Sequence, residues 1–395
     1  MAQTAVCPFC FHRIDVSRLW YQCLGRGSAE CKKEVDKVRE QLTKSTLETY
    51  CSFAPPEGVN GPAKCPTCGG RTNLRACPEC HTALPSDFAE SKSPMIGLIG
   101  AKNSGKTVLM TVLVKRLRDT VGKRYQADIR LATDNPDGHQ GVSDYQANRE
   151  TPLFKGGTLP PPTSALGTSA RQHSSPVLLR WRQETPGLMG RTSIKSTMLS
   201  FVDAAGEDLN AVATAFTLQY LSVCDGLIVV LDPFALPGAR AVLNLPDAAV
   251  QVEEDVPLDV VANITEMLRV EHNLKKKQKI AIPISVVFSK IDAFFPTLDR
   301  GNPLMTTAPA VAAYDNADGH AVHEHMLALM HQWNAQDIDT HVRLNYSDYR
   351  YFGVSALGAE PDYENFTVAA GGVRPHRVED PVLWLLSKTR TVRSA

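Results

Sequence analysis

The run from residue 95 to residue 107 constrains the fold more than any other part of the chain, because a strand-like apolar segment leads directly into the pattern G-x-x-x-x-G-K-T. Gly100 and Gly105 allow backbone conformations that are closed to residues with a Cβ, so that the N–H groups of the loop, Asn103 and Ser104 included, can turn inward around an anion. A helix with regular apolar spacing follows and would direct its positive N-terminal dipole at the anion. The sequence therefore predicts a phosphate-binding loop between a strand and a helix.

Two side chains of this loop have expected roles. Lys106 would reach the β- and γ-phosphates of a nucleotide, and the hydroxyl of Thr107 would ligate Mg²⁺. The alternative is a chance match in a glycine-containing loop. The strand before the motif and the helix after it argue against this alternative.

Bulk properties limit the kinds of protein to consider. The 395 residues suggest two domains, and Lys+Arg and Asp+Glu both total 42, so the net charge gives no reason to expect nucleic acid as a partner. No stretch approaches the roughly 18 apolar residues of a membrane span. The N-terminus lacks the basic and apolar regions of a signal peptide, which favours a cytoplasmic protein.

Nine of the ten cysteines lie before residue 81. Cysteines of a cytoplasmic chain stay reduced, so clustered ones are expected to bind metal rather than form disulfides. Two C-x-x-C turns would present four thiolates to one tetrahedral Zn²⁺. The expected ligands of this zinc ribbon are Cys65, Cys68, Cys77 and Cys80.

A second zinc site is expected from Cys7, Cys10, Cys23 and Cys31, with Cys51 also available. Spacing does not exclude an interleaved arrangement, in which the first C-x-x-C turn shares a metal with the third. The segment 33–50 is charged and has helical character. A polar bridge before residue 95 predicts a boundary between a zinc-binding module at 1–90 and a larger domain at 91–395.

Downstream, a β-rich run from residue 196 ends in Asp203, which opens the pattern D-x-x-G. Asp203 could hold Mg²⁺ through water, and the N–H of Gly206 could contact a γ-phosphate. The motif is weak alone and gains weight because it follows a phosphate loop.

Two later strand-like runs each precede a short motif. After residues 282–288 comes Ser289, Lys290, Ile291 and Asp292; the Asp292 carboxylate could accept hydrogen bonds from the guanine N1–H and amine, while the Lys290 stem covers the base. After a run from residue 351 comes Ser355, Ala356 and Leu357, whose backbone could contact the base oxygen. A polar strand end of no special role is the alternative for the first motif. The second motif says little in isolation and gains its value from its position in the order of motifs.

The order of these motifs resembles the TRAFAC class of P-loop GTPases across residues 95–390. More narrowly, the cysteine turns, the D-A-A-G-E run and the segment 377–386 resemble bacterial double-GTPase type 2 proteins. The resemblance implies an α/β fold with a Ras-like doubly wound sheet, Mg²⁺-dependent binding of GTP and GDP, GTP hydrolysis, and a place in bacterial conflict or defence systems.

The chain also departs from the pattern. Ser289 stands where Asn or Thr is common, and Glu207 stands where many GTPases have Gln or His to orient water. A carboxylate near the γ-phosphate would be repelled by it, so hydrolysis should be slow without an activating protein partner. The alternatives are a nucleotide-gated interaction protein with negligible turnover and a zinc-ribbon ATPase acting on nucleic acid.

A long insertion precedes residue 196. Thr163 is the expected switch threonine that ligates Mg²⁺, with Thr168 second. Arg171 could act as an internal arginine finger or be an exposed loop residue.

Overall fold

The computed structural model describes residues 4–56, 61–101, 103–132, 145–160, 176–186, 192–203, 219–243 and 256–395. The chain divides into two compact units. The cysteine unit contains residues 1–94, 130–145 and 167–202, and the sheet unit contains residues 95–129, 146–166 and 203–395. The predicted boundary near residue 90 stays a prediction about how the chain is divided into domains.

The sheet unit is built on four parallel strands that lie side by side in the order in which the chain forms them. They are β10 (Met95–Gly100), β14 (Gly226–Leu231), β15 (Ile284–Phe288) and β16 (Tyr349–Gly353). Their near-continuous apolar runs suit strands buried on both faces. In register, Gly100 pairs with Val230 and Phe288 pairs with Gly353, so the carboxyl ends of the strands meet at one edge. The expectation of a mixed α/β chain with a parallel sheet is confirmed.

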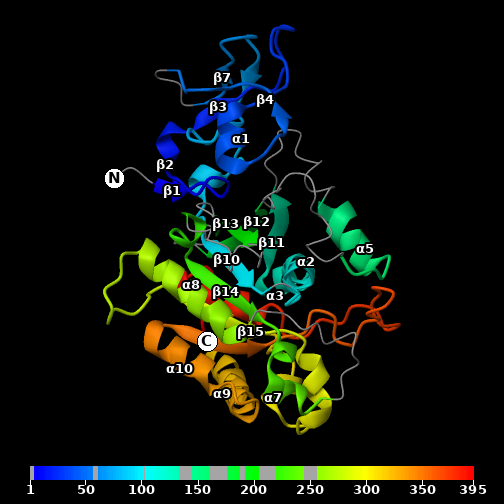
Figure 1. Ribbon diagram of the computed structural model, residues 1–395. Helices are drawn as coiled ribbons and strands as arrows, with labels where there is room; N and C mark the ends of the chain where they lie inside the picture. The colour runs from blue at the N-terminus through cyan, green and yellow to red at the C-terminus, as the bar shows by residue number, and fades with distance from the viewer. Residues whose placement is uncertain are drawn as a thin grey trace. The chain divides into compact units, whose positions relative to one another are not determined.

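Helices surround these strands (Figure 1). The α-helices of this unit are α2 (Lys106–Arg116), α3 (Gly122–Tyr125), α5 (Thr151–Phe154), α7 (Pro237–Arg240), α8 (Pro257–Glu271), α9 (Asn316–Gln332), α10 (Gln336–Asn345) and α11 (Asp380–Lys388). The π-helices are η3 (Leu117–Val121) and η4 (Gln146–Glu150), and the 3-10 helices are η8 (Pro233–Ala235), η10 (Ile291–Thr297) and η11 (Pro303–Met305).

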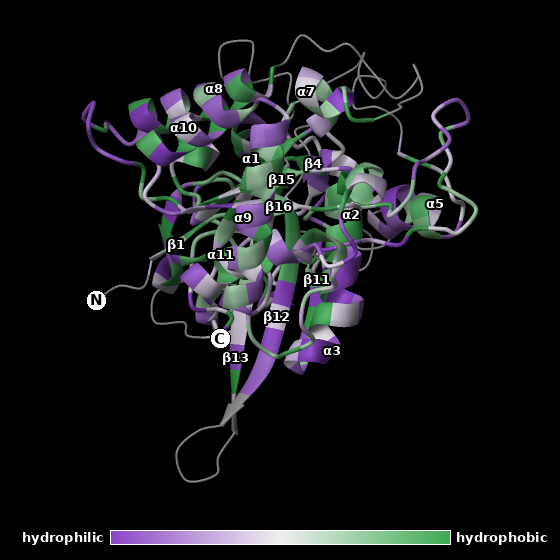
Figure 2. Ribbon diagram, turned by 90° about the horizontal axis from the view of Figure 1, so that it is seen from below, coloured by the Kyte–Doolittle hydropathy of each residue, from purple (hydrophilic) through white to green (hydrophobic). Residues whose placement is uncertain are grey.

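The helices pack by their apolar residues. Helix α9 contacts β16, α11 contacts β14 and β15, and α10 contacts α8 and α9. Hydrophilic and hydrophobic residues alternate along α10 (Figure 2), and the buried ones include Ile338 and Val342. A surface helix needs only such a stripe to bury itself against a core.

Apart from one long hairpin, the cysteine unit has short elements. They are β1 (Thr4–Val6), β2 (Arg13–Asp15), η1 (Val16–Arg18), β3 (Trp20–Gln22), β4 (Glu34–Val35), α1 (Lys37–Thr43), β5 (Glu48–Thr49), β6 (Ser52–Phe53), β7 (Ala63–Lys64), β8 (Arg71–Thr72), β9 (Arg75–Ala76) and η2 (Phe88–Glu90). Helix α1 covers only part of the segment 33–50, for which the sequence predicts helical character, because Lys44 ends the helix with a φ of 58°.

An antiparallel hairpin completes the cysteine unit. Its strands are β12 (Val177–Pro186) and β13 (Thr192–Asp203). Leu178 and Met198 of the hairpin share a buried cluster with four of the cysteines. Strand β11 (Ala127–Ala132) crosses the division between the two units.

Candidate nucleotide site and cysteine clusters

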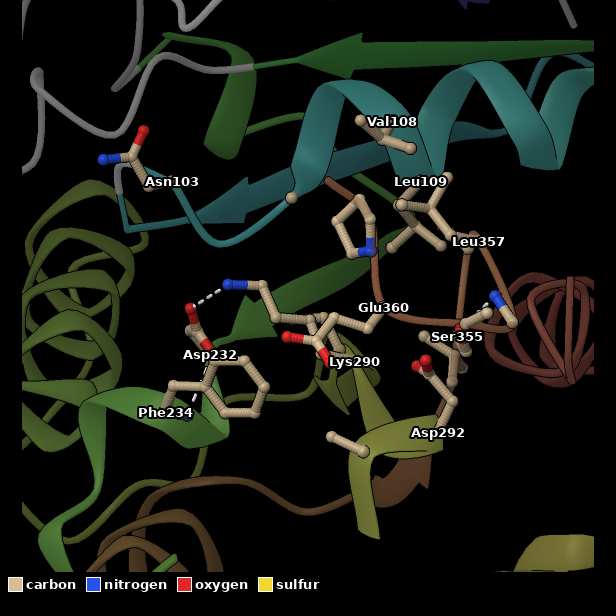
Figure 3. Close-up of a pocket in the computed structure, with 18 of the residues that line it drawn as sticks. Asn103, Val108, Leu109, Asp232, Phe234, Lys290, Asp292, Ser355, Leu357 and Glu360 are labelled. Carbon is tan, nitrogen blue, oxygen red and sulfur yellow. Dashed lines mark hydrogen bonds and ion pairs between the residues drawn. The ribbon is translucent and has the colours of Figure 1, made fainter. Parts of the chain in front are cut away.

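A cavity of about 680 Å³ opens at the carboxyl ends of the parallel strands (Figure 3). Three of the sequence motifs, far apart along the chain, contribute to its wall. The predicted site residues that line it are Asn103, Gly105, Lys106, Thr107, Ser289, Lys290, Asp292, Ser355, Ala356 and Leu357. The parallel register explains why the three motifs lie together, because each motif directly follows one of the four strands.

The phosphate loop depends on backbone conformations that few residues adopt. A Cβ at Gly100 would lie 2.2 Å from the Val230 carbonyl oxygen of the neighbouring strand, so only glycine fits. Asn103 and Gly105 have φ values of 58° and 83°. Such left-handed positions favour glycine and tolerate asparagine.

Polar groups of the loop are bonded to its own backbone. The buried Lys106 ammonium donates to the carbonyl oxygens of Gly100 at 2.8 Å and Ala101 at 2.5 Å. The Ser104 hydroxyl, fully buried behind the loop, donates to the Ala101 oxygen at 2.8 Å. Since Lys106 is the first residue of α2, the loop places its cation and the helix N-terminus at the same point.

Lys290 is held at the opposite wall. Its ammonium donates to the Asp232 carboxylate at 2.5 Å and lies 4.8 Å from the centre of the Phe234 ring. Figure 3 shows this pair in the cavity wall. Sequence reasoning did not select Asp232 or Phe234 for the site. The available signal was the position of Asp232 as the carboxylate directly after a buried strand.

Asp292 and the 355–357 segment come from neighbouring strand ends. Asp292 lies in the first turn of η10 and lines the cavity. The Ser355 N–H donates to the His376 oxygen at 3.0 Å, and the Ser355 hydroxyl accepts from the Gly358 N–H at 2.7 Å. Ser355 therefore stabilises the loop, while Ala356 and Leu357 also line the cavity.

The loop after β16 adds residues that no sequence pattern indicated. Tyr363 and Phe366 line the cavity together with Glu360. Burial raises the pKa of the Tyr363 phenol, and the nearby carboxylates of Glu360, Asp232 and Asp292 raise it further. This end of the cavity is acidic and aromatic, with the Lys290 ammonium as a counter-charge.

Several predicted residues lie outside what the structure describes. Thr163, Thr168, Arg171, Gly206 and Glu207 fall in segments without described structure. Asp203 is the last residue of β13, and only its backbone is described. The roles assigned to these six residues stay predictions.

The first cysteine cluster contains Cys7, Cys10, Cys77 and Cys80, all buried. The sulfur atoms of Cys7 and Cys80 lie 3.8 Å apart, as do those of Cys10 and Cys77. The expected pairing of the 65–68 turn with the 77–80 turn is wrong, and the interleaved alternative is correct.

Strand pairing is the physical reason for this arrangement. Strand β9, which leads into the 77–80 turn, pairs with β3, while β6 pairs with the other side of β3. Strand β3 follows the β1–β2 hairpin within a few residues, so its pairing with β9 brings the 77–80 turn close to the 7–10 turn. The second turn, at 65–68, is left to another cluster.

The second cluster contains Cys23, Cys31, Cys51 and Cys65, whose sulfurs all lie within 4.8 Å of one another. Its membership differs from the prediction, because Cys7 and Cys10 belong to the first cluster and Cys51 belongs here. The Cys68 sulfur lies 3.5 Å from that of Cys23, so five thiols gather at this position.

Both clusters have the donor set of a structural zinc site. Four thiolates around one position are typical of Zn²⁺, and both cysteine tetrads could hold it. Burial raises the pKa of the Cys7 thiol, because a thiolate loses its hydration there. A divalent cation would compensate for that loss, which fits a metal better than four free thiols.

Comparisons with known proteins give one relative over nearly the full length. The chain is 27% identical over 408 residues to the protein named "Putative ESX-1 scaffolding and assembly protein SaeC" from Mycolicibacterium smegmatis, covering 96% of this chain and 98% of that protein. No protein-family model matches the chain.

Among solved structures, the chain matches the bacterial selenocysteine-specific elongation factor EF-Sec at 14% identity, with a TM-score of 0.26 over 75% of this chain. It spans only 29% of that structure, and so low a TM-score does not define a shared fold. Within the described ranges, no helix is long and apolar enough to cross a membrane.

Proposed function

We propose that this protein is a cytoplasmic GTP-binding switch that hydrolyses GTP to GDP and phosphate, with Mg²⁺, on a Ras-like doubly wound P-loop domain. One observation carries the proposal: the phosphate loop, the S-K-x-D motif and the S-A-L motif line a single cavity of about 680 Å³. That volume lies within the range of small-molecule sites, about 300–1,000 Å³.

The phosphate end of the site supports the proposal through its own geometry. The loop excludes a Cβ at Gly100 and uses left-handed backbone at Asn103 and Gly105, which is the shape that lets N–H groups face an anion. Lys106 would exchange its bonds to loop carbonyls for bonds to the β- and γ-phosphates. Thr107 and Asp203 would hold Mg²⁺, which neutralises charge on the phosphates when bound.

The opposite end would select the base. Asp292 can accept two hydrogen bonds from the N1–H and amine of guanine, and adenine lacks that donor pair. The Lys290 stem, fixed by its bond to Asp232, would cover one face of the ring. Guanine nucleotides are therefore the proposed ligands.

A second candidate is a nucleotide-gated assembly protein with negligible turnover of its own. It is favoured by the name of the relative SaeC, a putative scaffolding and assembly protein. Glu207, at the expected water-orienting position, supports slow hydrolysis as well. Under either proposal a protein partner is expected to complete the function.

The test measures nucleotide binding and phosphate release side by side, with GTP and with ATP, in Mg²⁺. Lys106→Ala should abolish binding to the phosphates, while Lys115→Ala, on the same helix, serves as the matched control. GTP-selective turnover that Lys106→Ala removes would support the hydrolase. Selective binding without turnover would favour the gated assembly protein, and equal affinity for ATP would contradict both.

Base selection is tested separately. Asp292→Asn should cost GTP about 10- to 100-fold in affinity, because a hydrogen-bonded charge contributes roughly 1.5–3 kcal/mol. The control is Asp299→Asn, an exposed carboxylate a short distance along the chain. Unchanged guanine preference in Asp292→Asn would contradict the assigned role.

A further inference from the structure

The second cysteine cluster holds one thiol more than a tetrahedral metal can bind. Zn²⁺ takes four ligands in a structural site. We propose that this cluster is a zinc site with a replaceable ligand, in which Cys51 and Cys68 compete for the fourth position beside Cys23, Cys31 and Cys65. The proposal is independent of the nucleotide site.

Sulfur distances support Cys51 as a ligand. Zinc–sulfur bonds of about 2.3 Å place tetrahedral sulfurs roughly 3.8 Å apart. The sulfurs of Cys31, Cys51 and Cys65 are all separated by 3.7 Å, and Cys23 lies 3.8 Å from Cys31. These separations match the edges of the expected tetrahedron.

Backbone geometry supports Cys68 equally well. In the 65–68 turn, the Cys65 N–H donates to the Gly70 oxygen and the Gly69 N–H donates to the Cys65 oxygen, both at 2.9 Å. The 7–10 turn has the same pair of bonds, with Cys7 donating to the His12 oxygen. The second cysteine of that turn, Cys10, faces the same cluster as the first.

The 65–68 turn is thus shaped to present both of its sulfurs to one metal, yet Cys68 stands outside the group of four mutually close sulfurs. It lies 3.5 Å from Cys23 and is buried, whereas Cys51 is the most solvent-accessible cysteine of the five. A small shift of the metal toward Cys68 would release Cys51 into solvent. A shift toward Cys51 would leave the Cys68 thiol covered by protein.

The first cluster provides the internal contrast. Its four cysteines are all buried, and no fifth thiol joins them in the described part of the chain. Replacing any one of them removes a metal ligand, and no neighbouring thiol of the described chain can take its place. The second cluster should instead survive the loss of either competitor.

Zinc content and affinity of the full chain test this directly, using Cys51→Ala, Cys68→Ala, the double variant and Cys10→Ala as the matched control. Each single variant in the second cluster should keep two zinc ions, with affinity lowered by no more than about tenfold. The double variant and Cys10→Ala should each lose one. Loss of zinc in only one of the single variants would overturn the proposal, because that cysteine would then be an obligatory ligand.

Alkylation of the zinc-loaded protein gives a second readout that needs no loss of metal. Iodoacetamide should label Cys51 in the wild type, because that thiol is free whenever Cys68 binds zinc. In Cys68→Ala the labelling of Cys51 should fall at least severalfold, since Cys51 is then required by the metal. Equal labelling rates in the two proteins would contradict competition.

Discussion

The cysteine unit and the sheet unit reach a stable fold by different means. Strands of the cysteine unit contain two or three residues outside its hairpin, and their packing centres on groups of thiols. Three of the parallel strands of the sheet unit, β10, β14 and β15, contain five or six residues that are all buried. The first unit should therefore need its metal in order to fold, whereas the second should need its ligand only in order to act.

The largest expected effect comes from removing zinc. A chelator at neutral pH should abolish amide protection in β3 and β9, because apparent zinc-binding energies of about 10–16 kcal/mol also serve as folding energy in small metal-bound modules. Hydrogen–deuterium exchange in β14 and β15 should change little. Collapse of protection in both units together would show that they fold as one and would remove the contrast.

A steric change in the sheet unit should produce the reverse pattern. Gly100→Val places side-chain atoms against the Val230 carbonyl and should destabilise the sheet unit by about 3 kcal/mol, with two zinc ions retained. Gly301→Val is the control, since nothing lies within 4 Å of a Cβ there. Thermal unfolding and metal analysis measure the two effects, and an unchanged melting temperature for Gly100→Val would refute the close approach.

Loss of the carboxylate beside Lys290 should affect binding more than stability. Asp232→Ala frees the Lys290 side chain and should weaken guanine-nucleotide binding by about fivefold to tenfold, or roughly 1–1.4 kcal/mol. This is less than the loss expected for Asp292, because Asp232 acts only by positioning Lys290. Asp348→Ala breaks a comparable ion pair with Lys388 and is the control. Equal nucleotide affinity in both variants would mean that Lys290 needs no partner to adopt its position.

The smallest effect is a dependence of stability on pH. Burial lowers the pKa of His323 and His341 below the ordinary value of 6.5. At a pH between the lowered pKa values and 6.5, the unfolded chain therefore binds more protons than the folded one. Stability of the sheet unit should accordingly fall as pH drops below about 6.5, at up to 1.4 kcal/mol per pH unit for each histidine. His323→Gln should flatten this slope, and the exposed His331→Gln should not.

Zinc loss at low pH has to be separated from this histidine effect, because protonated thiols release metal. Local hydrogen exchange in β16, which contacts His323 through the Tyr351 N–H, reports on the sheet unit alone. A slope unchanged by His323→Gln would assign the pH dependence to other groups.

The sequence located the cavity-lining motifs because each motif is local and the strand before it is regular, whereas the roles assigned to their residues stay predictions. The loop containing Lys106, the motif ending in Asp292 and the 355–357 segment each follow a buried parallel strand, and such strands deliver their ends to one edge. Spacing could not assign the cysteines, because the three C-x-x-C turns look alike and their pairing depends on which strands flank β3. Tyr363 escaped notice because it lies in an irregular loop without periodicity.

The contact of Leu178 and Met198 with the first cysteine cluster has a consequence for synthesis of the chain. All four cysteines of that cluster are translated before residue 81, while the hairpin that covers them follows roughly a hundred residues later. At about 5–20 residues per second, the ribosome needs on the order of ten seconds to make the intervening segment. During this interval the nascent protein can already bind its first zinc ion, but the apolar side of the cluster stays open to chaperones until β13 emerges.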